Sequence, residues 1–310
     1  MINSDLLLMR IFIKEVSSKN YIMNSLSIGI ISYNEEKNIT NLLNSIKAQY
    51  LGKFSLKEII ISDDSDDDTP FLIKEFIKNN SQFLIRLFHH NERRGASAGW
   101  NEIFREAKGD YLVLYDADVI LEKETTYNLV NGFSSEIGLC AGNPQPIEII
   151  NIYGRATKFI STWLQNVRKV GLTQFMVMGR GLAIRQDLAK VIIISDNIIA
   201  IDYFLQLKVL ELNKKVIYVD NSKIYFKTPK NLEDFLSQVL RANFGHKQLS
   251  YFKTKKLSFV TSLKITFKSF LFDPYGGIAT LYCYFFIPYY KLNYKHNMLS
   301  KWDIAKSTKG

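Results

Sequence analysis

The chain has 310 residues, 47% of them apolar, and a formal net charge of +10. This length suffices for one large domain or two small ones, and the apolar fraction can fill a substantial core, which excludes a disordered chain. The two cysteines, Cys140 and Cys283, have no partner at ligand spacing, which excludes a disulfide framework and a zinc site and favours a reducing compartment.

Residues 1–23 form an N-terminal extension in which charges such as Asp5, Arg10 and Lys14 interrupt the apolar residues. No small-residue cleavage site follows a clean apolar core, so we predict no signal peptide. The extension is either a short accessory helix or the product of an upstream start codon, since Met23 lies just before the first predicted strand.

Apolar periodicity predicts alternating strands and helices in the first part of the chain. Buried strands are expected at 26–31, 58–61, 85–88 and 111–115, and helices at 39–46, from Thr69 onward and at 98–107. This alternation predicts an α/β fold whose mostly parallel sheet is covered by helices on both faces. Ligands of such sheets bind at the carboxyl ends of the strands.

Three polar clusters follow predicted strands at that edge, at residues 32–35, 62–69 and 116–118. The third cluster places two carboxylates, Asp116 and Asp118, at the mouth of a buried strand. Carboxylates suit Mg²⁺ or Mn²⁺, and Mg²⁺ is usually bound by one or two protein carboxylates together with phosphate oxygens of a substrate. The same spacing also fits an ordinary polar turn.

The acidic cluster at residues 63–68 allows two other interpretations. It fits a solvated loop that caps the next helix, and it partly fits a calcium loop. The EF-hand ligand positions 1, 3, 5 and 12 would be Asp64, Asp66, Asp68 and Glu75. Calcium is disfavoured because Thr69 replaces the required glycine and because a strand leads into the loop.

Together these segments resemble the inverting nucleotide-sugar glycosyltransferases of family 2, which have the Rossmann-like GT-A fold. Residues 62–69 (SDDSDDDT) resemble the family's S-D-G-S-T-D-G-T loop, and residues 30–35 resemble its opening strand and loop. Residues 91–101 resemble its N-x-G-x-x-x-A-x-N element with imperfect spacing. The resemblance covers residues 24–120, in the order that the family has.

The resemblance implies roles for individual residues. Asp63 would contact the nucleotide base, Tyr33 and Glu35 would lie beside it, and Asp116-Ala117-Asp118 would be the DXD motif that holds the metal. The implied nucleotide-binding residues are Tyr33, Glu35, Asp63, Arg94 and Asp116, and the implied metal ligands are Asp118 and Asp116.

The downstream half resembles the family more weakly. Residues 179–185 resemble its glycine-containing acceptor strand, and Asp202 stands where the family often has a Glu-Asp pair, with Ile201 in place of the Glu. Asp202 is therefore the implied catalytic base, with a helix cap as the alternative. Residues 238–242 resemble the Q-x-x-R-W motif of processive members without its Trp, which disfavours a polymerase. The implied acceptor-side residues are Arg185, Gln238 and Arg241.

The implied reaction is transfer of a sugar with inversion at its anomeric carbon. A Mg²⁺ or Mn²⁺ ion would stabilise the departing nucleoside diphosphate, and Asp202 would accept the proton of the acceptor hydroxyl. A lipid phosphate acceptor is already ionised and would need only to be oriented. Additional phosphate clamps are possible at Arg94, Arg180 and Arg185.

Basic charge is concentrated in residues 247–310, which contain eleven lysines and two aspartates, a net charge of +9, whereas residues 1–246 carry +1. Aromatic residues alternate with these lysines. This composition suits an anionic membrane surface, with nucleic acid as the rival partner. The uncharged run at 274–290 is short for a bilayer span and contains Gly276, Gly277 and Pro288, so we favour an interfacial or re-entrant segment over a span or a buried hairpin.

The expected organisation is an N-terminal extension, a GT-A domain at 24–246 and a basic amphipathic C-terminal region at 247–310. The GT-A domain divides into a nucleotide-binding half at 24–120 and an acceptor half at 121–246. The expected location is cytoplasmic, peripheral at the inner face of the cell membrane, with a lipid-linked or glycan acceptor and no nucleic acid. A non-catalytic nucleotide-sugar-binding or membrane scaffold protein and a nucleic-acid-binding protein are the alternatives.

Overall fold

The computed structural model describes residues 25–171, 173–252, 255–293 and Thr308; the predicted N-terminal extension, residues 1–23, lies outside this part of the chain. The strands are β1 (Ser25–Ser32), β2 (Ser55–Asp63), β3 (Ile85–His89), β4 (Tyr111–Asp116), β5 (Val119–Leu121), β6 (Ile137–Ile147), β7 (Gly181–Arg185) and β8 (Lys215–Lys227). The helices are α2 (Ile39–Lys47), α3 (Thr69–Asn79), α4 (Ala96–Glu106), α5 (Thr125–Asn131), α6 (Ile152–Val170), α7 (Gln186–Ala189), α8 (Ile201–Glu211), α9 (Leu232–Gln248), α10 (Phe259–Phe272), α11 (Pro274–Phe285) and α12 (Ile287–Asn293).

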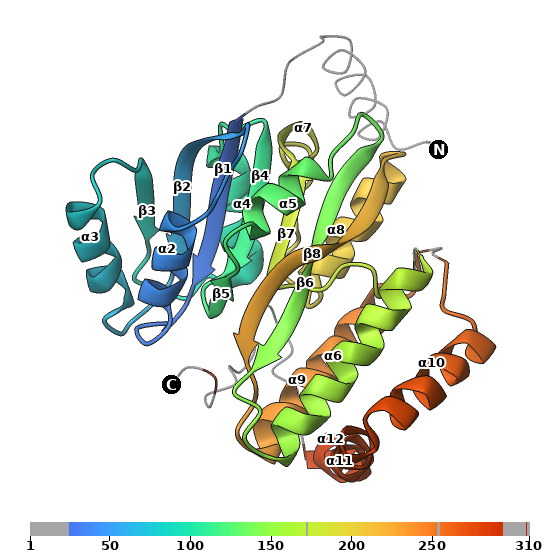
Figure 1. Cartoon of the computed structure of the whole chain (residues 1–310). Coiled ribbons are helices and arrows are strands. Elements are labelled where there is room, and N and C mark those ends of the chain that lie inside the picture. Colours follow the sequence, from blue (N-terminus) through green and yellow to red (C-terminus); the bar gives the residue numbers. More distant parts are fainter. Residues whose placement is uncertain (1–24, 172, 253–254, 294–307, 309–310) are drawn as a thin grey trace.

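The strands form one sheet in the order β3-β2-β1-β4-β7-β6-β8-β5 (Figure 1). Parallel pairing joins β3, β2, β1 and β4, and it also joins β6 to β8. Antiparallel pairing places β7 between β4 and β6 and β5 against β8. The predicted mostly parallel sheet is confirmed. In the middle of the sheet, β7 runs antiparallel to both of its neighbours.

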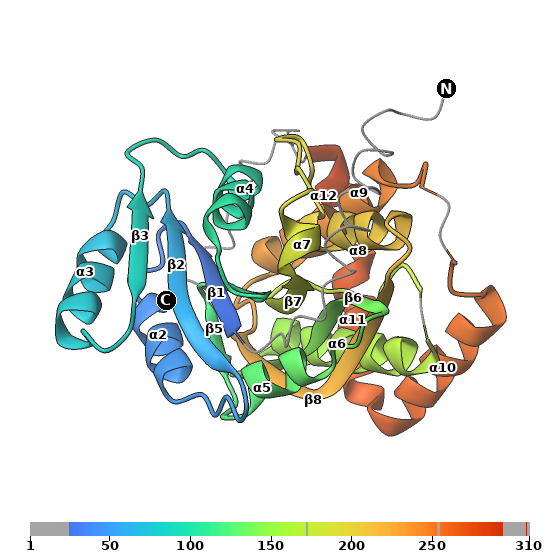
Figure 2. The same cartoon turned by 90° about the horizontal axis from the view of Figure 1, so that it is seen from above.

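Helices cover both faces of the sheet, as the alternating pattern predicts (Figure 2). Side chains of β1 alternate between two apolar cores, so that Ile28 and Ile30 pack on the face covered by α2, α3 and α5. On the other face Ile103 of α4 and Leu114 of β4 belong to the second core. Gly29 permits this contact, because a Cβ atom there would lie 2.5 Å from Ile103 Cγ2.

Strand register brings the predicted polar clusters to one edge of the sheet. Ser32 of β1 pairs with Asp63 of β2, and Ile31 pairs with Asp116 of β4. The antiparallel strand β7 begins at this same edge, since Gly181 pairs with Tyr115. The carboxyl ends of β1, β2 and β4 and the amino end of β7 therefore meet in one place.

The C-terminal helices pack on α6 and α9 instead of on the sheet. Ala279 and Cys283 of α11 are buried with Ala156 of α6 and Leu236 of α9 in a third apolar core. The preceding helix, α10, also contacts α6, because Trp163 Nε1 donates a hydrogen bond to the Thr266 hydroxyl at 2.9 Å. One face of α10 and α11 is thus packed against α6 and α9, as the alternative of a buried helical hairpin expects.

The opposite face of α10 and α11 is exposed and apolar. Its exposed large side chains are Phe259, Val260, Leu263, Phe267, Leu271, Phe272, Tyr275, Ile278, Leu281, Tyr282, Tyr284 and Phe285. Among the described residues no single helix is long and apolar enough to cross a bilayer. Phe259–Phe272 and Pro274–Leu292 together reach such a length and composition, but a bend of 119° separates them.

Candidate active site

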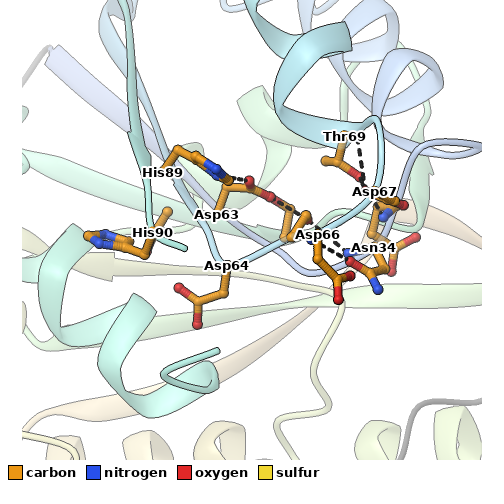
Figure 3. Close-up of polar contacts among 12 residues, drawn as sticks. Asn34, Asp63, Asp64, Asp66, Asp67, Thr69, His89 and His90 are labelled. Atoms are coloured by element: carbon orange, nitrogen blue, oxygen red, sulfur yellow. Dashed lines mark hydrogen bonds and ion pairs between the residues drawn. The ribbon is translucent and has the colours of Figure 1, made fainter. Parts of the chain in front are cut away.

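The loops that follow β1 and β2 are joined by hydrogen bonds in which a backbone N–H of one loop donates to a side-chain oxygen of the other (Figure 3). Asn34 accepts a hydrogen bond from the backbone N–H of Asp66 at 3.0 Å. Thr69, the first residue of α3, accepts one from the N–H of Glu35 at 2.8 Å. Asp67 in turn accepts from the N–H of Thr69. These hydrogen bonds hold the acidic loop, residues 63–68, in a defined conformation at the carboxyl edge of the sheet.

Asp63 is fully buried at the end of β2. Its Oδ1 accepts hydrogen bonds from the hydroxyls of Ser32 and Ser65, both at 2.6 Å, and its Oδ2 lies 2.8 Å from His89 Nδ1. Figure 3 shows His89 directed at this carboxylate. Base recognition by Asp63 stays a prediction, and it requires a base to share an oxygen that already has protein donors.

The other residues expected beside the base lie in the same region. The guanidinium carbon of Arg93 lies 4.2 Å from the centre of the Tyr33 ring. The guanidinium therefore stacks on this ring and places a positive charge beside Tyr33. Glu35 is buried, and its Oε2 accepts a hydrogen bond from Asn38 Nδ2 at 2.8 Å. Glu35 thus anchors the start of α2 as well as lining the loop.

Arg94 belongs to an internal charge network. Its guanidinium donates to Asp64 Oδ1 at 3.1 Å and to Glu102 Oε2 at 2.9 Å. Burial alone raises the pKa of Glu102, but hydrogen bonds from Arg94, Ser62 and His90 outweigh it and hold that pKa below its usual value. Asp64 also accepts from the backbone of Arg94, so these contacts tie α4 to β2. Because the Arg94 guanidinium already donates to Asp64 and Glu102, this geometry does not provide the predicted phosphate clamp.

Asp116 and Asp118 flank the turn between β4 and β5, beside the loop that leads into β7. The N–H of Asp116 donates to the carbonyl of Arg180 at 3.3 Å, and Asp118 Oδ2 lies 3.6 Å from Arg180 Nη1. Burial, together with the neighbouring carboxylates of Asp118 and Asp202, raises the pKa of Asp116 to about 6, against the opposing effect of Arg180 and Arg241. Negative charge at this turn is therefore incompletely balanced by the protein.

Asp202, in the first turn of α8, approaches the same turn from the other side. Its Oδ2 accepts a hydrogen bond from the N–H of Gly179 at 2.7 Å. A Cβ atom on Gly179 would lie 3.7 Å from Asp202 Oδ2 and 3.9 Å from Asp116 Oδ2. The glycine therefore leaves open the space between the two carboxylates, and the contact of Asp202 is with a distant loop instead of with its own helix end.

Gln206 holds this loop from the next turn of α8. Its Oε1 accepts from the N–H of Val177 at 3.1 Å, and its Nε2 donates to the carbonyl of Thr173 at 2.8 Å. The sequence reasoning missed this residue. Its signal was the four-residue spacing from Asp202, which places both side chains on one face of the helix.

Arg241 of α9 contributes positive charge to the same site. Burial lowers its pKa, as does Arg180, whereas Asp116, Asp202 and Asp118 raise it. Gln238 lies three residues earlier on the same helix, and this spacing places it on the same side of α9 as Arg241. Charged residues from the β4–β5 turn, α8 and α9 thus surround Asp116 at the end of β4.

Residues 27–193, more than half of the chain, match the family model described as Glycosyl transferase family 2. The chain belongs to glycosyl transferase family 2. This membership confirms the family and the class of enzyme that the sequence motifs predict.

The curated relatives of this chain are synthases that are longer than it is. The poly-beta-1,6-N-acetyl-D-glucosamine synthase of Staphylococcus aureus (strain COL) is 32% identical over 126 residues, which cover 40% of this chain and 29% of the synthase. The Staphylococcus epidermidis protein of the same name is 27% identical over 143 residues, 45% of this chain and 33% of that one. The chain therefore matches about a third or less of the length of these relatives.

Solved structures of similar fold confirm the GT-A prediction. The mannosyltransferase PcManGT from Pyrobaculum calidifontis, in complex with GDP-Man and Mn²⁺, superposes with a TM-score of 0.61 at 18% identity, over 90% of this chain and 81% of that one. S. aureus TarS 1-349 in complex with UDP-GlcNAc gives a TM-score of 0.55 at 17% identity, over 88% and 77% of the two chains.

One predicted acceptor-side residue of this family 2 chain lies elsewhere. Arg185 ends β7 and pairs with Tyr111 at the start of β4, which is the opposite edge of the sheet from Asp116. Its guanidinium forms a fork with Asp187, with Nη2 2.7 Å from Oδ2. The prediction for Arg185 is wrong because β7 runs antiparallel to β4, so its last residue points away from the site.

An aromatic group beside Asp202 was also missed. The rings of His246 and Tyr203 are stacked with centroids 4.5 Å apart, and Phe175 lies 5.4 Å from His246. Burial lowers the pKa of His246 although Asp202 raises it. His246 follows Arg241 by five residues on α9, and no ligand motif in the sequence marks it as part of the site.

The residues at the β4–β5 turn fit a divalent cation. Two carboxylates one residue apart are hard oxygen donors. Burial and the nearby Asp118 carboxylate both raise the pKa of Asp116, so its ionised form would be stabilised by a cation. Among the residues that the structure describes, no three His, Cys, Asp or Glu side chains are arranged as a complete protein cage for a metal. The donor set thus suits a cation that takes its remaining ligands from a bound substrate and water.

Proposed function

We propose that the protein transfers a sugar from a nucleoside diphosphate sugar to an acceptor, with inversion at the anomeric carbon. The observation that carries the proposal is the convergence of Asp118 and Asp202 on Asp116, beside Gly179 at the carboxyl edge of the sheet. The family match and the nucleotide sugars bound in the neighbouring structures support the same reaction.

In this proposal Asp116 and Asp118 hold Mg²⁺ or Mn²⁺. When bound, the cation supplies electrostatic stabilisation of the charge that develops on the departing diphosphate. The structural neighbour PcManGT is in complex with Mn²⁺, which supports such a cation here. The chain's own contribution is to fix two carboxylates at the short connection between β4, which pairs with β1 and β7, and β5, which pairs with β8.

Asp202 is the proposed base. The acceptor oxygen forms a bond to the anomeric carbon, the bond from that carbon to the diphosphate breaks with its electron pair, and the acceptor proton passes to Asp202. The hydrogen bond from Gly179 fixes one oxygen of the carboxylate and so orients the other. Such positioned proton transfer contributes about 10²- to 10⁴-fold to the rate.

A donor screen tests this function. Purified protein should release a nucleoside diphosphate from one of a panel such as UDP-GlcNAc and GDP-Man, with Mn²⁺ increasing the rate and EDTA abolishing it. Release is measured by chromatography of the nucleotide products, and mass spectrometry of the acceptor identifies the transferred sugar. A protein that binds a donor but releases nothing with any acceptor would instead be the non-catalytic nucleotide-sugar-binding protein.

The finer part of the proposal is that the acceptor is lipid-linked or a glycan and is met at the inner face of the cell membrane. The support is the exposed apolar face of α10 and α11 together with basic residues nearby. Phe267 and Leu271, one helical turn apart, are 65% and 70% exposed, and Lys264 and Lys268 lie on the same helix. Lysines beside exposed aromatic rings match the headgroup region of anionic bilayers.

Vesicle binding tests the membrane location. Phe267→Asp with Leu271→Asp should reduce sedimentation with vesicles of anionic phospholipid by at least about tenfold, because two apolar anchors are replaced by negative charges. Phe71→Asp, which changes an equally exposed phenylalanine on α3, is the matched control. Equal sedimentation of all three proteins would contradict the proposal, and tight salt-dependent binding to nucleic acid instead would favour the rival partner.

A further inference from the structure

Three arginines could in principle bind the phosphates of a donor, and the structure separates them. Arg94 is held by Asp64 and Glu102, and Arg185 is held by Asp187 at the far edge of the sheet. Arg180 alone of the three faces the carboxylates of the β4–β5 turn. Its position in the chain, between two glycines, is also unusual.

The backbone of Arg180 adopts a left-handed conformation, with φ of 84°. Non-glycine residues rarely adopt this conformation, and where they do the surrounding structure holds them there, often at functional sites. Here the carbonyl of Arg180 accepts from the N–H of Asp116, and the hydrogen bond from Gly179 to Asp202 fixes the preceding residue. The chain thus keeps an arginine where glycine would be easier to accommodate.

The side chain of Arg180 is held from one side only. Its guanidinium carbon lies 3.7 Å from the centre of the Phe226 ring, so the plane rests against an aromatic face. The ion pair with Asp118 is 3.6 Å long, beyond the range of a strong hydrogen bond. Among the described residues the guanidinium makes no hydrogen bond within that range, and its side chain is 19% exposed.

A small pocket adjoins this arginine. Its lining includes Asp118 and Phe226, the two residues that contact Arg180, and also Asn38 and Lys227. Lys227 Nζ donates to Asn38 Oδ1 at 2.9 Å, which brings a second cation to the same wall. The carboxylate of Asp118 and the ammonium group of Lys227 therefore border one small space, beside the Phe226 ring on which the Arg180 guanidinium rests.

We propose that the Arg180 guanidinium binds the diphosphate of the donor and stabilises it as it departs. This inference rests on the proposed transfer reaction and identifies one of its catalytic residues. When the bond between the anomeric carbon and the diphosphate breaks, the electron pair stays on the diphosphate oxygen. Arg180 donates hydrogen bonds to the phosphate oxygens without transferring a proton, and its planar fork of donors suits them. The Phe226 ring fixes the fork before the charge develops, as electrostatic stabilisation of a leaving group requires.

Arg180→Gly is the decisive variant, because glycine accepts the left-handed backbone and only the guanidinium is lost. Calorimetry in EDTA should show that the unaltered protein binds UDP or GDP more tightly than the matching monophosphate. In Arg180→Gly the diphosphate affinity should fall about tenfold with the monophosphate affinity nearly unchanged, and kcat should fall about 10²-fold. The diphosphate affinity and kcat of Arg180→Lys should lie between those of the unaltered protein and of Arg180→Gly. The melting temperature of Arg180→Gly should equal that of the unaltered protein.

EDTA separates this role from a purely positioning one. If Arg180 only held Asp118 for the metal, then in EDTA Arg180→Gly would bind the diphosphate as the unaltered protein does, and that result would overturn the proposal. Arg105→Ala, which removes an arginine with a 66% exposed side chain on α4, is the control and should change neither affinity. The binding arm does not depend on turnover, so a protein that releases no sugar while Arg180→Gly still loses diphosphate affinity would contradict the proposed reaction and support the Arg180 contact.

Discussion

Asp202→Asn should lower the rate of sugar transfer by about 10²- to 10⁴-fold while leaving nucleotide affinity nearly unchanged. Asparagine has the same shape, and its side-chain oxygen can still accept the hydrogen bond from Gly179 that places the loop. What it cannot do is accept a proton from the acceptor hydroxyl. The measurements are kcat with a saturating donor and the Kd for the nucleoside diphosphate, both in Mn²⁺.

The control for this prediction is Asp110→Asn. Asp110 accepts hydrogen bonds from Ser25 at the amino end of β4, on the opposite edge of the sheet, so its substitution should affect neither quantity beyond a small change in stability. Equal losses of turnover and nucleotide affinity in Asp202→Asn would mark the residue as structural. Full turnover in Asp202→Asn would show that no base is needed, as for an acceptor that is already an ionised phosphate.

The fold of residues 24–120 was predictable from the sequence because its strands are buried on both faces and its loops are short. Parallel strands joined by helices place every carboxyl end at one edge, so Asp63 and Asp116 could be brought together without coordinates. The register confirms this, since both residues lie beside adjacent positions of β1. Strand ends were displaced by only one to three residues, as for β2, which begins at Ser55.

Residues 121–246 were less predictable because their strands change direction. Short apolar segments such as β7 carry no signal of orientation, and the role of Arg185 rested only on the resemblance of residues 179–185 to the family's acceptor strand. The partners of a charged side chain are equally hidden. Arg94 reads as a phosphate ligand until Asp64 and Glu102, from two other segments, are seen to occupy it.

The C-terminal region shows the difference between composition and surface. Its aromatic content was visible in the sequence, but two of the apolar residues at 274–290, Ala279 and Cys283, are buried against α6 and α9. Tyr275 and Phe285 are 74% and 79% exposed on the other side. The hairpin and the interfacial interpretation each describe one face of α11, and only the packing of α6 could assign the faces.

Asp118→Ala should lower metal-dependent turnover by about 10³-fold, since a bound cation contributes several kcal/mol of stabilisation to a departing diphosphate. The fold should persist, because Asp118 is partly exposed and its ion pair within the described residues is the 3.6 Å contact with Arg180. Removing this carboxylate also removes the acidic partner of the Arg180 guanidinium, which then interacts more strongly with a phosphate. The Kd for the diphosphate should therefore rise in Mn²⁺ but stay equal or fall in EDTA.

Titration of Mn²⁺ against turnover, with the melting temperature recorded in parallel, checks this result. Asp68→Ala removes an exposed carboxylate from the neighbouring acidic loop, where Asp68 makes no side-chain cap to α3. If general negative potential at the rim attracted the cation, the two variants would lose activity to a similar extent. If Asp118 is a ligand, only its substitution changes the Mn²⁺ dependence. Unchanged turnover in Asp118→Ala would remove the metal assignment and leave Arg180 and Arg241 as the cations that stabilise the leaving group.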